Sequence, residues 1–143
     1  MITVDFDFNK ISVDLDRITA AANSAVRPAA QAAAQVFYDE ARARVPVSAA
    51  PHIFHGTHNK YLFKSGTLRD AIFQFHKGST AAHATYIVSW NHRKAPYGYM
   101  VEYGTSRAPA HPFLRPAYDA AKERAATFAQ SRMAAAVKEA LLR

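Results

Sequence analysis

Three histidines in one short stretch are the residues of this sequence best suited to chemistry. His52, His55 and His58 recur at spacings of three, and imidazole is a common ligand for zinc or nickel. The stretch holds Gly56 and Asn59 but no carboxylate that could orient a ligand ring. Two interpretations follow: a metal-dependent hydrolase built on these histidines, or a polar surface loop. We favour the loop, and we predict neither a metal nor another cofactor.

Other arrangements that could support catalysis are sparse. Asp70 and Glu102 are the only acidic residues in the middle of the chain, and nothing fixes their separation as an acid and base pair would require. The chain has no cysteine, which excludes disulfides and thiolate chemistry, and it lacks the GxGxxG and P-loop patterns. We therefore expect a protein that is not an enzyme. For Glu102 we expect a structural role, either capping amides at 104–106 or pairing with Arg107 or Arg115.

The charge of the chain favours an anionic partner. The sequence has 18 lysines and arginines against 11 acidic residues, a net charge of +7, which attracts nucleic acid or an acidic protein surface. Aromatic residues that could stack on bases are interspersed with the basic ones, namely Tyr61, Phe63 and Trp90. The alternative is an aromatic core with a solvated basic rim. If the chain contacts DNA, the residues expected to face it are Lys60, Lys64, Arg93 and Lys94.

Length and periodicity predict a single α+β domain over residues 1–143. Residues 1–45 are predicted as an N-terminal helix region, because apolar residues recur every three or four positions along it. Pro28 interrupts this pattern and should kink or split the helix. Residues 46–64 mix Pro, Ser, His, Gly and Asn without periodicity, which predicts an exposed loop.

The second half of the chain is predicted to hold a small antiparallel sheet and a long helix. The sheet region is 65–115, with strand formers at 72–76 and an alternating run at 84–90. The C-terminal helix is 116–143, and it begins at Pro116, where a missing N–H does no harm. Its predicted apolar face includes Tyr118, Ala121, Ala125, Phe128 and Leu141. We expect the N-terminal and C-terminal helices to flank the sheet.

The charge pattern of the first residues bears on the cellular location of the protein. They are acidic where a signal peptide would be basic and then apolar. No window approaches the roughly eighteen consecutive apolar residues of a membrane-spanning helix. We therefore expect a soluble protein that is not exported.

The segment 101–121, VEYGTSRAPAHPFLRPAYDAA, has an unusual order of glycine, prolines and Phe-Leu-Arg-Pro. Gly104 is placed where a left-handed residue would end the preceding element. The prolines that follow should hold the chain extended until the last helix begins. This segment resembles the minor tail or neck component family of long-tailed bacteriophages. The N-terminal helix, the motif at 65–72 and the closing helix also resemble that family, so the resemblance covers most of the chain.

The resemblance implies a structural morphogenesis protein that assembles as a ring at the head-tail junction and helps to complete the tail. Its partners would be further copies of itself and other neck or tail proteins, with non-specific contact to genomic DNA. It would act in the host cytoplasm during assembly and then belong to the virion. The implied assembly motif comprises Glu102, Gly104, Thr105, Pro109, Pro112, Phe113, Leu114, Arg115 and Pro116.

Roles within that motif have more than one interpretation. Phe113 and Leu114 could be apolar anchors for a neighbouring subunit, with Arg115 as a directional contact. Alternatively, both apolar residues could seat the last helix in the core of their own chain. At the level of the whole protein, a basic nucleic-acid-binding accessory protein is the main alternative, and the metal-dependent hydrolase is the second.

Overall fold

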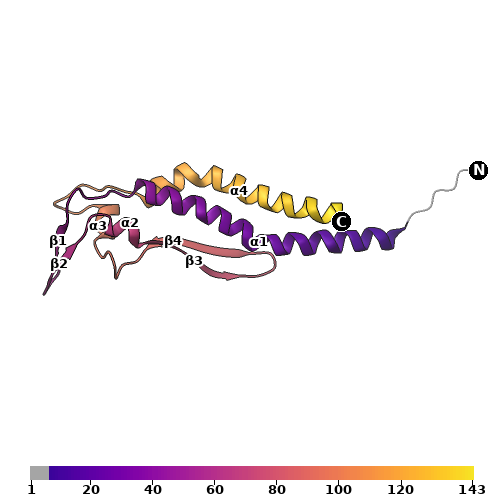
Figure 1. Ribbon diagram of the computed structural model, residues 1–143, viewed down its shortest axis with the longest axis horizontal. Coiled ribbons are helices and arrows are strands. Elements are labelled where there is room, and N and C mark those ends of the chain that lie inside the picture. Colours follow the sequence, from indigo (N-terminus) through magenta and orange to yellow (C-terminus); the bar gives the residue numbers. More distant parts are fainter. Residues whose placement is uncertain (1–6) are drawn as a thin grey trace, which may run out of the picture.

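Two long helices and two short hairpins make up the fold. The computed structural model describes residues 7–143, and Figure 1 shows the helices side by side along an elongated molecule. The predicted α+β class is confirmed. No helix within residues 7–143 is long and apolar enough to cross a membrane. The elements are α1 (Phe8–Arg44), β1 (His52–His55), β2 (Lys60–Phe63), α2 (Thr67–Ala71), β3 (Ile72–Ser79), β4 (Ala84–Trp90), α3 (Gly98–Tyr103) and α4 (Leu114–Leu142).

The N-terminal helix is continuous through its proline. The Asp7 side chain caps α1 by accepting the backbone N–H of Asn9 and Lys10, and the helix runs for 37 residues to Arg44, which confirms its predicted end. Pro28 lies inside it, and the helix axis changes direction partway along (Figure 1). The predicted kink therefore occurs without a split, as expected when only one internal hydrogen bond is lost. Residues 1–6 of the predicted helix region lie outside the described residues.

Alanines form the contact between α1 and α4. The buried residues of both helices are all alanines, and their small side chains let the two backbones approach closely. The larger residues assigned to the apolar face of α4, Tyr118, Phe128 and Leu141, are instead exposed. That part of the face prediction is wrong, because a seam of alanines leaves no room for large side chains between the helices. The buried alanines are Ala25, Ala29, Ala34 and Ala41 of α1 with Ala117, Ala121, Ala125 and Ala140 of α4.

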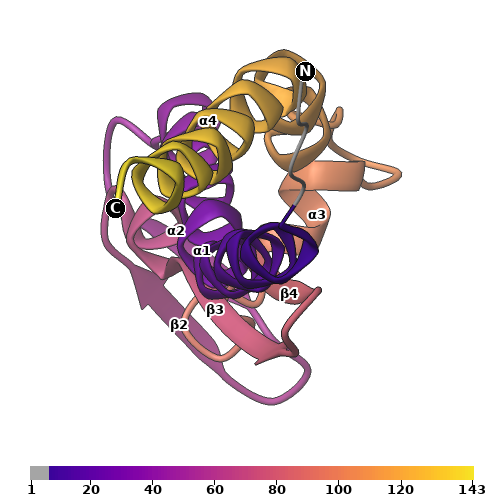
Figure 2. The same ribbon diagram turned by 90° about the vertical axis from the view of Figure 1, so that its right-hand side faces the viewer.

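The strands form two separate antiparallel pairs in place of one sheet. In the β3–β4 pair, Ile72 faces Trp90, and the pairing becomes irregular between His76 and Gly78. The β1–β2 pair lies within 46–64, so the predicted exposed loop is mostly exposed but folds as a hairpin. The prediction that the helices flank the sheet is also wrong, because α1 lies between α4 and the β3–β4 pair (Figure 2).

The hydrophobic core lies at one end of the molecule, where the end of α1, α2, the start of β3, the end of β4 and the start of α4 converge. Phe113 is fully buried there, and its ring meets that of Trp90 edge-on with centroids 5.8 Å apart. Leu68 and Ile72 are also buried in this cluster. The motif segment is therefore built onto the core.

Candidate assembly surfaces

The Glu102 carboxylate caps the last helix. Although Glu102 is buried, its oxygens accept the backbone N–H groups of Phe113 at 2.7 Å, Leu114 at 3.0 Å and Arg115 at 3.2 Å. Pro116 has no N–H, and the Ala117 N–H already reaches the Phe113 carbonyl at 3.1 Å. Every N–H at this helix start is therefore paired, and the negative charge lies at the positive end of the helix dipole.

These bonds correct two predictions and confirm one. The structural role of Glu102 is confirmed, but its partners are the first amides of α4, not the 104–106 turn. The Arg115 contact is made by its backbone N–H. The last helix begins at Leu114, two residues before the predicted start at Pro116. Proline is tolerated at the third helical position for the reason that applies at the first, since none of these N–H groups has a partner inside the helix.

Gly104 folds the motif back on itself. Its φ of 75° is in the left-handed half of backbone space, and a Cβ there would lie 2.7 Å from the Ala110 nitrogen. The Thr105 hydroxyl accepts two N–H bonds from the turn, and the His111 N–H donates to the Val101 carbonyl at 2.8 Å. The predicted turn at Gly104 is confirmed. The proline-rich segment, which was predicted to be extended, is a loop tied at both ends by backbone hydrogen bonds.

The motif residues divide into buried and exposed sets. Phe113 has none of its surface exposed, so the prediction that it anchors a neighbouring subunit is wrong and the core interpretation holds. Leu114 is half-buried against the same core. The motif residues that remain accessible to a partner are Thr105, Pro109, Pro112 and Arg115.

The four basic residues predicted to face DNA are all exposed but are not gathered on one surface. Lys64 and Lys94 line one shallow depression that also contains Asp70, whereas Arg93 borders another beside Phe73. Lys60 lies on β2, at the far hairpin. The structure thus brings only Lys64 and Lys94 together.

Two of the three aromatic residues predicted to stack on bases are used for packing. Trp90 is buried in the core. Phe63 packs against Tyr97 with ring centroids 4.9 Å apart. Tyr61 is about half exposed, and of the three it is the ring most accessible to a base. The alternative of an aromatic core with a solvated basic rim describes most of this region.

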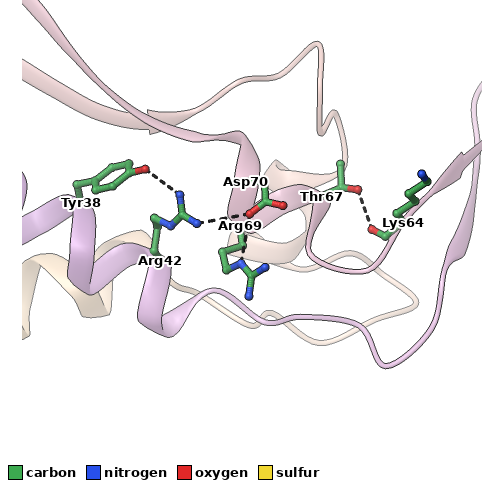
Figure 3. A network of polar contacts seen from close by, with 6 residues as sticks. All are labelled: Tyr38, Arg42, Lys64, Thr67, Arg69 and Asp70. Atoms are coloured by element: carbon green, nitrogen blue, oxygen red, sulfur yellow. Dashed lines mark hydrogen bonds and ion pairs between the residues drawn. The ribbon is translucent and has the colours of Figure 1, made fainter.

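Asp70 joins α2 to α1 and is held between two guanidinium groups (Figure 3). One Oδ atom accepts from Arg42 at 3.5 Å and from Arg69 at 3.3 Å, and Arg42 also donates to the Tyr38 hydroxyl at 2.8 Å. The Thr67 hydroxyl donates to the Lys64 carbonyl at 2.7 Å. Because Arg42 belongs to α1 and Arg69 to α2, Asp70 is a surface contact between these two helices.

The three histidines do not converge. His52 and His55 point to opposite faces of β1, and His58 lies in the exposed turn that follows. The His52 ring packs edge-on against Tyr97, with centroids 4.7 Å apart. Within residues 7–143 no group of three or more His, Cys, Asp or Glu side chains is arranged to hold a metal ion. The geometry that the hydrolase interpretation needs is therefore not formed by these residues.

Glu40 is the polar link between the two long helices. Its carboxylate accepts from Arg44 of α1 at 2.7 Å and from Arg124 of α4 at 2.9 Å. These hydrogen bonds and charges lower the pKa of Glu40 below its ordinary value of 4.5. The sequence could not indicate this contact, because Arg124 is 84 residues away.

Large apolar side chains are exposed over much of the molecule, which is a feature that the sequence patterns did not locate. They occur on the start of α1, both hairpins, α3 and α4. Where such residues are neighbours on the surface, their exposed apolar area is suited to protein association. Residues with at least 44% of their surface exposed include Ile11, Leu15, Ile53, Leu62, Phe75, Tyr99, Tyr103, Tyr118, Phe128 and Leu141.

An apolar groove lies between α1, β4 and α4. Its volume is about 420 Å³, and it is lined on three sides by alanine and aromatic side chains, including Phe37, Tyr86 and Tyr118. The rings of Phe37 and Tyr118 stack with centroids 5.5 Å apart across the two helices. The groove and the exposed apolar residues are therefore the surfaces most suited to binding. No protein-family model, curated protein or solved structure matches this chain.

Proposed function

We propose that this chain is a structural component of tailed-bacteriophage assembly that forms a ring at the head-tail junction and helps to complete the tail. The resemblance of residues 101–121 to the minor tail and neck family suggests this role. The observation that carries the proposal is the exposure of large apolar side chains at both ends of an elongated chain. Such area is buried when copies of a subunit and their neighbours pack together.

The contacts made by two carboxylates, those of Glu102 and Asp70, support a structural protein over an enzyme. Glu102 is saturated by three backbone donors, and Asp70 is held by two guanidinium groups. Glu102 is buried and both of its oxygens are occupied, so it lacks the open approach that a general acid or base needs; Asp70 is exposed and is paired with guanidinium groups. On this proposal the chain acts in the host cytoplasm during assembly and then stays in the virion with other neck or tail proteins.

The net charge of +7 has a use in a ring through which genomic DNA passes, because a positive lining attracts the phosphate backbone without reading sequence. Lys64 and Lys94 are the best placed of the four candidate residues, since they share one depression. The rival proposal of a DNA-binding accessory protein gains less support, because the four residues do not form a continuous stripe.

Electron microscopy and sedimentation of the purified protein test the proposal. We expect monomers at low concentration and closed rings as the concentration rises, with virions lacking the protein arrested before the tail is joined or finished. A protein that stays monomeric at every concentration, while its absence leaves tails complete, would contradict it. Strong, salt-sensitive retardation of duplex DNA by the monomer would favour the accessory protein instead.

A further inference from the structure

The start of α1 projects beyond its partner helix. Figure 1 shows α1 continuing past the C-terminal end of α4, and the end of α4 lies beside Arg17 and Ser24. We call residues 8–18 the arm. Ile11 and Leu15 lie on its apolar stripe, with 44% and 58% of their surface exposed. The same stripe continues into Ala25, which is buried, so Ile11 and Leu15 lie on the part of the stripe that α4 does not cover.

The apolar groove offers a surface of matching length. Its wall on α1 extends from Ala30 to Ala41, which at 1.5 Å per residue is about 16 Å. The arm spans about 15 Å by the same measure. The α1 side of the groove is lined by small alanine side chains such as Ala33. The larger apolar side chains of the arm can pack against these alanines, as the ridges of one helix pack into the grooves of another.

Charges around the two surfaces are also complementary. Arg27, Arg115 and Lys122 are exposed and lie one helical turn from groove residues. The arm has three carboxylates against two cations within residues 8–18 and the capping residue before them. Opposite charges at the rim of a contact speed association and fix its orientation.

The arm cannot reach the groove of its own chain. Leu15 and Ala33 belong to one continuous helix, and their separation along it is about 27 Å at 1.5 Å per residue. A helix cannot fold back on itself without breaking, so an arm that docks in the groove must come from another copy.

We propose that the arm of each copy docks in the apolar groove of the next, with Ile11 and Leu15 facing Ala33 and its neighbours. This inference rests on the proposed ring, and it identifies the contact that joins neighbouring subunits. The contact is heterologous, because the arm and the groove are different surfaces, and a repeated heterologous contact closes into a ring when its rotation permits.

The size of the contact explains how assembly is controlled. An arm of about 15 Å can bury only a few hundred Å² per copy, below the roughly 1,200 Å² total of stable complexes. A single contact is therefore weak and short-lived, whereas a closed ring gains from all of its contacts together. Subunits stay apart until a neighbouring ring or a high local concentration gathers them.

Disulfide trapping tests the contact directly, because the chain has no cysteine of its own. One preparation carries Leu15→Cys and a second carries Ala33→Cys, and the two are mixed under mild oxidation. We expect a crosslinked pair that forms on the order of tenfold faster in the mixture than in either preparation alone, since docking raises the effective thiol concentration. Val13→Cys is the matched control, because residue 13 is similarly exposed on the opposite side of the arm.

The outcomes separate the contact from the ring. Equal rates for Leu15→Cys and Val13→Cys would overturn the docking proposal, and fast self-crosslinking of Leu15→Cys would show an arm-to-arm contact in its place. Microscopy of the Ile11→Ser/Leu15→Ser variant completes the test, with Val13→Ser as control. We expect the double variant to need on the order of tenfold more protein to form rings. Rings at unchanged concentration would refute the arm contact and leave the ring intact, whereas wild-type protein without rings would refute the proposed function.

Discussion

Replacing Glu102 with glutamine keeps the shape of the side chain but removes its charge. The carboxylate accepts three N–H groups at 2.7 to 3.2 Å, and an amide offers one acceptor oxygen and directs its NH₂ group at the remaining donors. The variant therefore loses at least one hydrogen bond to a charged group, about 1.5–3 kcal/mol. It also loses the charge at the helix start, up to about 2 kcal/mol at a buried site. We expect Glu102→Gln to lower the free energy of unfolding by about 3 kcal/mol.

Urea denaturation followed by circular dichroism measures this change. With a denaturant dependence of about 2 kcal/mol per molar urea, the midpoint should fall by about 1.5 M. Hydrogen exchange should accelerate first at the Arg115 amide, which loses its acceptor when the single amide oxygen stays with Phe113 and Leu114. Glu123→Gln is the control, because Glu123 is an exposed carboxylate on the same helix, and its effect should stay within about 0.5 kcal/mol. If the two variants have the same midpoint, the capping argument is wrong.

Three further predictions concern the turn, the ion pair and the basic residues. Gly104→Ala should lower the free energy of unfolding by about 1–3 kcal/mol, because Gly104 has a left-handed φ and a Cβ there would contact Ala110. Gly78→Ala is the control and should change the free energy of unfolding little, because a Cβ at residue 78 would have open space around it. Thermal unfolding of the two variants measures the difference. Because the pKa of Glu40 is lowered in the folded state, its contribution to stability is present above pH 4.5 and is lost as the pH falls through the folded pKa. Unfolding measured against pH should therefore show a smaller loss of stability on acidification for Arg124→Gln than for wild type, and identical profiles would contradict the link. Charge reversal at the four basic residues should weaken DNA retention and its salt dependence in a filter-binding assay while ring formation persists, and unchanged retention would refute a DNA-facing role for Lys60, Lys64, Arg93 and Lys94.

The periodicity of apolar residues predicted the positions of the long helices and of β4, but not the contacts between elements. The end of α1 and the bounds of β4 followed from repeating apolar residues, because that pattern reflects burial on one face. The β1–β2 pair was missed because its strands have four residues each, too short for alternation to stand out from a polar loop. The start of α4 was placed two residues late, because its cap comes from Glu102, 11 residues before Phe113. Local capping rules cannot anticipate a cap supplied from another element.

The size of the apolar side chains determines which residues of α4 contact α1, and their spacing in the sequence does not show it. The spacing placed alanine and larger residues on one face, but in the structure the alanines meet α1, while Phe128 and Leu141 remain exposed. A helix pair joined by alanines is close and narrow, so residues at the edges of the stripe lie outside the contact. The sequence alone does not distinguish the alanines that contact α1 from the larger residues beside them. Those larger residues remain exposed and are available for binding.

Mutational tests of the proposed assembly should use exposed residues and not residues of the core. Phe113 and Glu102 are buried, so replacing either one should weaken the proposed ring formation by destabilising the fold, even if neither residue touches a neighbour. Loss of assembly in such variants therefore carries no information about contacts. Variants at Leu15 and Val13 avoid this ambiguity, because both residues are exposed on one helix and neither helps to form the core. A difference in assembly between them would therefore indicate a contact made by the arm and not a change in the fold.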